Sequence, residues 1–334
     1  MSDIEDMLSV PEPKVDTERA LARLRARVDA ERIAPVNRGV SGSRRIAVNV
    51  WVRALAAAAT IALVATLLTA SGLAETILTI FEPKQLVAVP ITVGDLSGAP
   101  SFDAYGTLTW TAQPKPYDVP DKTTAARESG MTVLVPSDLP AGIGAARYGV
   151  MPKTTATFTF SAEKTKQAAA AQQRTPPPMP ANIDGSKLFI TGGPAVVAYY
   201  DDGTKPSGPT GATGASPFTG MPKLIVAQGK PPVVQSDGVT VEQLQSYLLA
   251  QPGISPQLAA QIRAIKDPSS TLPVPIPVDM ATSKKVTVQG VEGIFVGDST
   301  GLGSAVIWQK DGIVYGVAGT LTEQQVLAVA NSLR

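Results

Sequence analysis

Two short motifs place a serine at a spacing that is used for covalent catalysis. Gly297–Gly301 (GDSTG) matches the G-x-S-x-G pattern, in which a tight turn presents the serine, here Ser299, as a nucleophile. Ser161–Lys164 (SAEK) matches the S-x-x-K pattern, in which the lysine activates the serine. The first pattern needs a histidine base, which the chain lacks, and the second has no S-D-N or K-T-G partner motif. We therefore expect a glycine-rich hairpin connection at the first motif and no catalytic role for either serine.

The absence of histidine and cysteine excludes most other catalytic and metal sites. Without imidazole the chain can form no Ser–His–Asp triad and no histidine-ligated zinc site, and without thiols it can form no disulfide. The carboxylates are scattered, and no G-x-x-x-x-G-K phosphate-binding loop is present. These observations predict a protein that is not an enzyme and holds no cofactor and no metal. A hydrolase with two carboxylates far apart in the chain stays open.

The composition favours strands and turns over a helical bundle. The 334 residues are 44% hydrophobic and 17% charged, with 29 glycines and 29 prolines. This length suits one large domain or two modest ones. Residues 85–334 hold 18 basic and 18 acidic residues, so this part of the chain is neutral and has no electrostatic footprint for nucleic acid.

One apolar segment is long enough to span a bilayer. Ala54–Leu73 has no charged residue, and its twenty residues at about 1.5 Å each match the hydrocarbon thickness. Arginines precede it and acidic residues follow it, so the positive-inside rule predicts a single-pass protein of the cell membrane. The expected parts are a cytoplasmic arm at 1–50, a transmembrane helix at 51–74 and an extracytoplasmic domain at 85–334. A cleaved signal peptide, a twin-arginine export signal and a buried soluble helix are the alternatives.

The arm contains one expected amphipathic helix, at residues 16–32. Its apolar residues follow a helical spacing, and arginines flank them. An arm this short has no core in which to bury the apolar stripe, so we expect the helix to dock on a protein partner. A solvated helix and attachment to the lipid bilayer through the arginines are the alternatives. The candidate docking residues are Leu21, Leu24, Val28, Arg19, Arg23 and Arg27.

The rest of the chain is rich in strand-forming sequence. Residues 164–183 and 204–221 have the composition of linkers. Runs of β-branched and aromatic residues predict strands at 107–112, 131–135, 155–161, 187–191, 195–200, 223–227, 286–289, 304–309 and 313–318.

Several local signals fix turns and helix starts. Asp311-Gly312 is typical of a tight hairpin between the last two predicted strands. Helices are predicted to begin after Thr240, Ser255 and Thr322, because each residue can cap a helix N-terminus and precedes an apolar stripe. The last of these helices follows the hairpin so closely that we expect Trp308 and Leu333 to share one core.

Four stretches together resemble a known family. Gly130–Gly142 (GMTVLVPSDLPAG), Val286–Gly293 (VTVQGVEG), Ala305–Tyr315 (AVIWQKDGIVY) and Val317–Leu333 (VAGTLTEQQVLAVANSL) look like the extracytoplasmic domain of unknown function in many bacterial anti-sigma-factor-like membrane proteins. The resemblance implies an α+β fold with an antiparallel, half-barrel-like sheet and packed helices. It also implies regulation rather than catalysis, with a sigma factor as the partner of the arm. The arm lacks the His/Cys zinc motif of many anti-sigma factors, so binding would rest on the helix at 16–32.

The sequence therefore predicts a membrane-anchored, non-catalytic regulatory or signalling protein of the anti-sigma-factor-like type. The alternative is a surface-anchored binding or structural module of the cell envelope without a cytoplasmic partner. The two hypotheses differ in whether the arm binds a protein.

Overall fold

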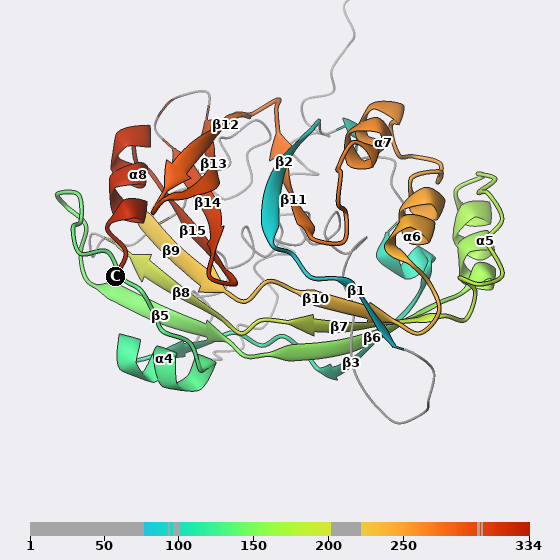
Figure 1. The fold of residues 1–334 in the computed structure, drawn as a ribbon, viewed down its shortest axis with the longest axis horizontal. Helices are drawn as coiled ribbons and strands as arrows, with labels where there is room; N and C mark the ends of the chain where they lie inside the picture. The colour runs from blue at the N-terminus through green and yellow to red at the C-terminus, as the bar shows by residue number, and fades with distance from the viewer. Residues whose placement is uncertain (1–76, 93, 96–100, 202–221, 299–300, 302) are drawn as a thin grey trace, which may run out of the picture. The chain divides into compact units, whose positions relative to one another are not determined.

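The fold is built mainly from strands. The computed structural model describes residues 77–92, 94–95, 101–201, 222–298, 301 and 303–334, which all belong to one compact unit of the chain. Strands take 41% of these residues and helices 21%. The strands form a five-stranded sheet, an eight-stranded sheet and a separate pair (Figure 1).

The five-stranded sheet is antiparallel throughout and has the order β1-β10-β7-β6-β3. Every second residue of β6 is buried, as a strand with one face on a core requires. Phe158 and Phe160 of β6 therefore enter a core that also contains Tyr247. The strands are β1 (Leu78–Phe81), β3 (Gly106–Ala112), β6 (Thr154–Phe160), β7 (Lys187–Gly192) and β10 (Val233–Ser236).

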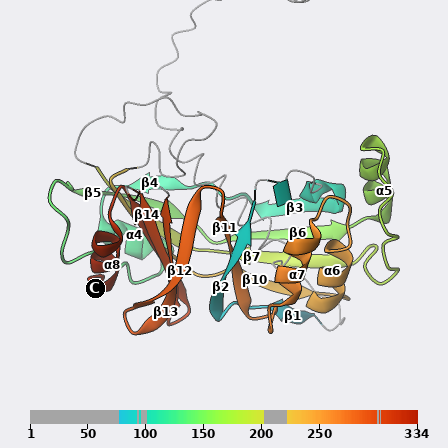
Figure 2. The same ribbon diagram turned by 90° about the horizontal axis from the view of Figure 1, so that it is seen from above.

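The eight-stranded sheet is also antiparallel, in the order β12-β13-β14-β15-β9-β8-β5-β4. A separate parallel pair, β2 (Gln85–Ile91) and β11 (Thr271–Pro277), lies between the β12–β14 side of this sheet and the helices (Figures 1 and 2). The strands of the large sheet are β4 (Tyr117–Val119), β5 (Ala146–Met151), β8 (Ala195–Tyr200), β9 (Leu224–Gly229), β12 (Ala281–Val288), β13 (Val291–Asp298), β14 (Ser304–Lys310) and β15 (Ile313–Gly319).

Four connections carry the chain directly from one large sheet into the other, and we call this line of connections the seam. β3 continues into β4 through residues 113–116 (QPKP), β5 into β6 through Pro152-Lys153, β7 into β8 through Gly193-Pro194, and β9 into β10 through residues 230–232 (KPP). The strands keep the same neighbours on both sides of the seam. Proline has no N–H to donate to a ladder, so pairing stops at these connections, each of which contains at least one proline. The seam thus divides what would be four long strands between two sheets.

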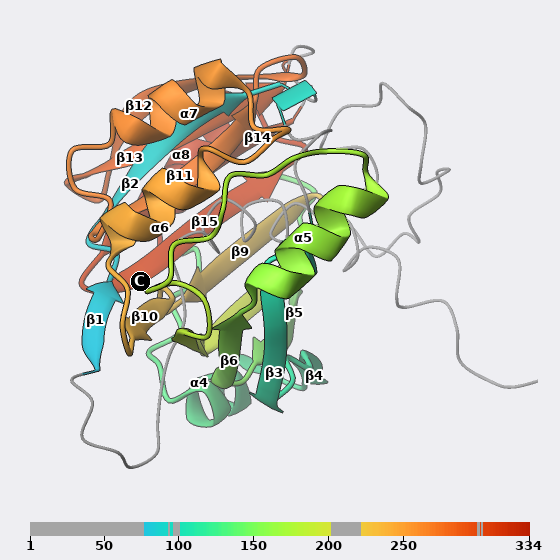
Figure 3. The same ribbon diagram turned by 90° about the vertical axis from the view of Figure 1, so that its right-hand side faces the viewer.

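Five α-helices and one short 3₁₀ helix complete the described part. Figure 3 shows α5 (Ala162–Ala171), α6 (Val241–Leu248) and α7 (Pro256–Arg263) together at the end that holds the five-stranded sheet. The predicted capping boxes at the starts of α6 and of α8 (Glu323–Asn331) are both present, and Ser255 caps α7 as expected. The others are α4 (Lys122–Ser129) and the 3₁₀ helix η3 (Phe102–Ala104).

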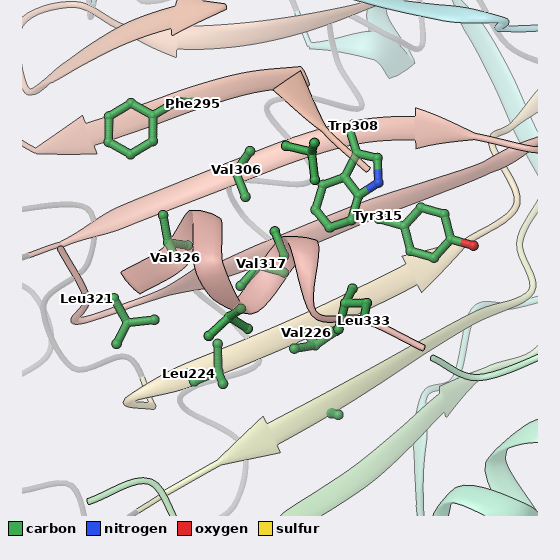
Figure 4. Close-up of a cluster of buried hydrophobic side chains, with 14 of the residues drawn as sticks. Leu224, Val226, Phe295, Val306, Trp308, Tyr315, Val317, Leu321, Val326 and Leu333 are labelled. Carbon is green, nitrogen blue, oxygen red and sulfur yellow. The ribbon is translucent and has the colours of Figure 1, made fainter. Parts of the chain in front are cut away.

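The C-terminal hairpin and α8 bury one apolar core, as the sequence predicted (Figure 4). Trp308 is fully buried, and its ring stacks on Tyr315 with centroids 5.3 Å apart. Val326 and Leu333 reach the same cluster from α8 and the residues after it. The predicted turn between β14 and β15 is confirmed as well, because Asp311 and its following glycine both have positive φ.

The fold-class prediction is wrong in its main feature. The chain forms several sheets and is mostly β, whereas we expected one half-barrel-like α+β sheet. The prolines of the seam are the physical reason, because they interrupt pairing along the strands. Residues 131–135, predicted as a strand, form none.

The prediction of a single-pass membrane protein is also contradicted. The longest helix in the described ranges, α5, has ten residues, and no helix there is long and apolar enough to cross a bilayer. The segment that prompted the prediction, Ala54–Leu73, lies outside the described residues, as does the linker predicted at 204–221.

Candidate functional site

A hollow lies on the seam, and we call it the seam cleft. It has a volume of about 510 Å³. Its walls are three of the four seam connections (152–153, 193–194 and 230–232), residues 82–84 between β1 and β2, and the turn between β14 and β15. A second hollow beside α5 measures about 10 Å³ and has room for no more than one water molecule. The seam cleft is therefore the candidate binding site.

Prolines open the cleft, and lysines stand next to them. Pro83-Lys84, Pro152-Lys153 and Lys230-Pro231 each join a proline to a lysine at the cleft or its seam connections. The prolines stop strand pairing, so the chain turns away and leaves a hollow. A lysine beside each proline then sits on an irregular connection, where its long side chain is free of the packing of the sheets.

The cleft carries an excess of positive charge. Its lining includes Lys84, Lys153, Lys230 and Lys310, against two carboxylates, those of Glu82 and Asp311. The first three lysines are exposed and the fourth is half-buried. Within the described part of the chain, none of these four ammonium groups forms an ion pair. Residues 85–334 as a whole are neutral, so the cleft concentrates positive charge locally.

Two hydrogen bonds hold the β14–β15 turn in the wall of the cleft. Gln309 Nε2 donates to the carbonyl oxygen of Pro83 at 2.7 Å and so joins this hairpin to the connection between β1 and β2. Lys310 Nζ donates to the carbonyl oxygen of Gln289 at 3.2 Å. The other amide atom of Gln309, Oε1, is buried and accepts no hydrogen bond from the described residues. These hydrogen bonds hold the wall in place, and the ligand-facing groups of the cleft are the lysine ammonium groups.

The structure gives Ser161 a capping role. Its Oγ accepts a hydrogen bond from the Lys164 backbone N–H at 3.3 Å at the start of α5. Lys164 Nζ instead donates to the carbonyl oxygen of Gly106 at 3.1 Å, so the ammonium group is committed to the backbone of β3. Ser299 lies outside the described residues, in the connection between the antiparallel strands β13 and β14.

The segment at 130–142 lies against the C-terminal end of the chain. Val135 and Arg334 exchange two backbone hydrogen bonds of 3.1 Å, and Pro136 forms a bridge with Leu333. Buried Gln228 fixes the same segment, because its Oε1 accepts from Leu134 N and its Nε2 donates to Leu134 O, both at 2.9 Å. The segment is therefore extended and firmly attached without belonging to a sheet.

The sequence did not lead us to the cleft. The docking candidates we predicted, Leu21, Leu24, Val28, Arg19, Arg23 and Arg27, lie outside the described residues. The signal we missed is the repeated pairing of proline with lysine at the ends of strands. No group of three or more carboxylates that could hold a metal occurs among the described residues.

Comparison of the chain with protein-family models, with curated proteins and with solved structures finds no match.

Proposed function

We propose that this chain is a non-catalytic regulatory protein that senses an anionic ligand in the seam cleft. The observation that carries the proposal is a set of four lysines around a hollow of about 510 Å³, none of which forms an ion pair with another described residue. Lysine ammonium groups bind phosphate and carboxylate groups as point charges. A ligand with two or more such groups would satisfy several lysines at once.

The position of the cleft supports a regulatory role. Its walls belong to both large sheets and to the β1–β2 connection, so a ligand would contact three parts of the fold together. Such a ligand stabilises the arrangement in which these parts are close. Binding would thereby change how firmly the two sheets are held at the seam, and a partner that reads this arrangement would respond.

The partner that we propose is bound by the N-terminal arm. The resemblance of four stretches to anti-sigma-factor-like proteins suggests a sigma factor, and the stripe of Leu21, Leu24 and Val28 is the proposed contact. If residues 1–50 capture no protein, a binding or structural module without such a partner is the better description.

The test is isothermal titration calorimetry at low ionic strength, in which pyrophosphate or citrate is titrated into the full chain. We expect binding that weakens as salt rises, since exposed charges are screened. The double variant Lys153→Gln/Lys230→Gln should bind about tenfold more weakly, because it removes two of the four cations.

The matched control is Lys284→Gln/Lys285→Gln. It removes the same charge from exposed positions on β12, where the two lysines pair with Glu323 and Glu292. The control should bind like the wild type. Equal losses in both double variants would mean that net charge alone drives binding, and an absence of binding at low salt would refute the cleft as an anion site.

A further inference from the structure

Most sheet edges of the described structure carry features that discourage pairing with another chain. The edge strand β12 exposes Lys284 and Lys285. The edge strands β1 and β4 have only four and three residues. The parallel pair contains a proline in β2 and three in β11. Lysines, prolines and short strands are the usual protections of an edge, because unpaired backbone groups otherwise recruit another strand.

The edge strand β3 has neither lysine nor proline and is not short, so its protection is a bulge near its end. Its seven residues, GTLTWTA, include no charged residue and no proline, and among the described residues it pairs only with β6. Thr107, Thr109 and Thr111 are exposed, while Leu108 and Trp110 pack partly against the core of the five-stranded sheet. A bulge between Trp110 and Ala112 bends the end of the strand, and the part before it is regular.

We propose that β3 pairs antiparallel with β3 of a second copy of this chain. The strand is self-complementary about Thr109. In a pairing centred there, each Leu108 faces Trp110 of the other copy on the core side. On the exposed side, Thr109 faces Thr109, whereas Thr111 lies in the bulge and is outside the regular part of the pairing. Aromatic–aliphatic and Thr–Thr pairs are favourable cross-strand neighbours, so the Leu108–Trp110 and Thr109–Thr109 pairs support the same register.

Charge at the two ends of β3 favours the same pairing. Asp103 lies in η3 just before β3, Lys115 lies in the connection just after it, and both side chains are exposed. Neither forms an ion pair within the described part of the chain. The two-fold symmetry of an antiparallel pair brings the acidic end of each strand to the basic end of the other. A second copy is therefore the occupant that the edge fits, and the two five-stranded sheets would join into one.

The test is the oligomeric state of the full chain, measured by sedimentation equilibrium over a range of concentrations. We expect a monomer–dimer equilibrium for the wild type. Thr109→Lys should raise the dimer dissociation constant at least tenfold, since two like charges would face each other at the symmetry axis. Thr287→Lys is the matched control, because it adds the same side chain at an exposed position of β12. It should leave the equilibrium unchanged.

A charge exchange tests the register without touching the strand. Asp103→Lys alone should weaken the dimer severalfold, and the double variant Asp103→Lys/Lys115→Asp should restore it, because the opposite charges meet again. Amide hydrogen exchange of residues 107–111 should also slow as the protein concentration rises. A wild type that stays monomeric, a dimer that tolerates Thr109→Lys, or a double variant that is weaker than the single one would overturn the proposal. None of these outcomes depends on the seam cleft.

Discussion

Gln228 offers a direct measurement of what one buried side chain contributes to this fold. The side chain is 2% exposed, and its amide forms two hydrogen bonds of 2.9 Å with the backbone of Leu134. Gln228→Met keeps the side-chain volume nearly constant. It removes the acceptor of the Leu134 backbone N–H and the donor to the Leu134 carbonyl oxygen. A neutral buried hydrogen bond contributes about 0.5–1.5 kcal/mol net, and an unpaired buried group costs about 1–3 kcal/mol.

We therefore expect Gln228→Met to lower the free energy of unfolding by roughly 2–3 kcal/mol. For a unit of this size that corresponds to a fall in Tm of roughly 4–12 °C. The assay is urea unfolding monitored by circular dichroism. The slope m, which is the dependence of the unfolding free energy on urea concentration, should be the same in the wild type and the variant. Because Gln228 holds the segment that pairs with Arg334, hydrogen exchange at residues 133–137 should rise more than exchange elsewhere in the variant.

The control is Gln235→Met on β10, the next strand along the chain. Gln235 Nε2 donates to Thr79 Oγ1 at 3.0 Å in an exposed position, so the substitution should cost no more than about 0.5 kcal/mol. If Gln228→Met were as stable as Gln235→Met, the two buried hydrogen bonds would not anchor the segment and the reasoning would fail.

Three further changes have definite expected outcomes. Trp308→Ala should lower the free energy of unfolding by about 3–5 kcal/mol in urea melts, because the indole is fully buried; a stability equal to that of the wild type would contradict the described core. Hydrogen bonds from Ser255 and Thr92 hold the pKa of Asp95 below its ordinary value of 3.8, so Asp95 stabilises the fold above that pH and this contribution disappears as acid protonates it. Unfolding measured from neutral to acid pH should therefore show a smaller acid loss for Asp95→Asn than for the wild type. In the arm, Leu24→Asp should abolish capture of a protein partner by residues 1–50 in pull-downs, whereas Arg23→Gln should only weaken it; equal capture by both would remove the apolar stripe as the contact.

Local chemistry explains what the sequence predicted well. A capping box depends on two residues three positions apart, such as Thr322 and Gln325, and a tight hairpin depends on Asp311-Gly312. These signals depend only on residues close together in the chain, so the sequence alone was enough to predict the helix starts and the turn. The packing of Trp308 with Leu333 was predicted from these signals, because the short connection between β15 and α8 requires the helix to pack against the adjacent hairpin.

Strands that break the usual patterns were missed. Nearly all residues of β13 are buried, so it lacks the alternation that marks a half-buried strand. β11 contains three prolines, which argue against a strand in the interior of a sheet but are tolerated where only one neighbour pairs. The seam cleft was beyond sequence reasoning for another cause, since its lysines come from connections that only the complete topology brings together.

The hydrogen bond between Gln309 and Pro83 indicates that the seam forms late in folding. These residues are 226 positions apart, whereas the hairpins from β12 to β15 join neighbouring segments. Closing a long loop costs more chain entropy than forming a hairpin, so the local hairpins are expected to form early and the seam late. The seam cleft then exists only in chains that have finished folding. A ligand that occupies it would bind the native state alone, and its effect on thermal unfolding would report how much of a sample is correctly folded.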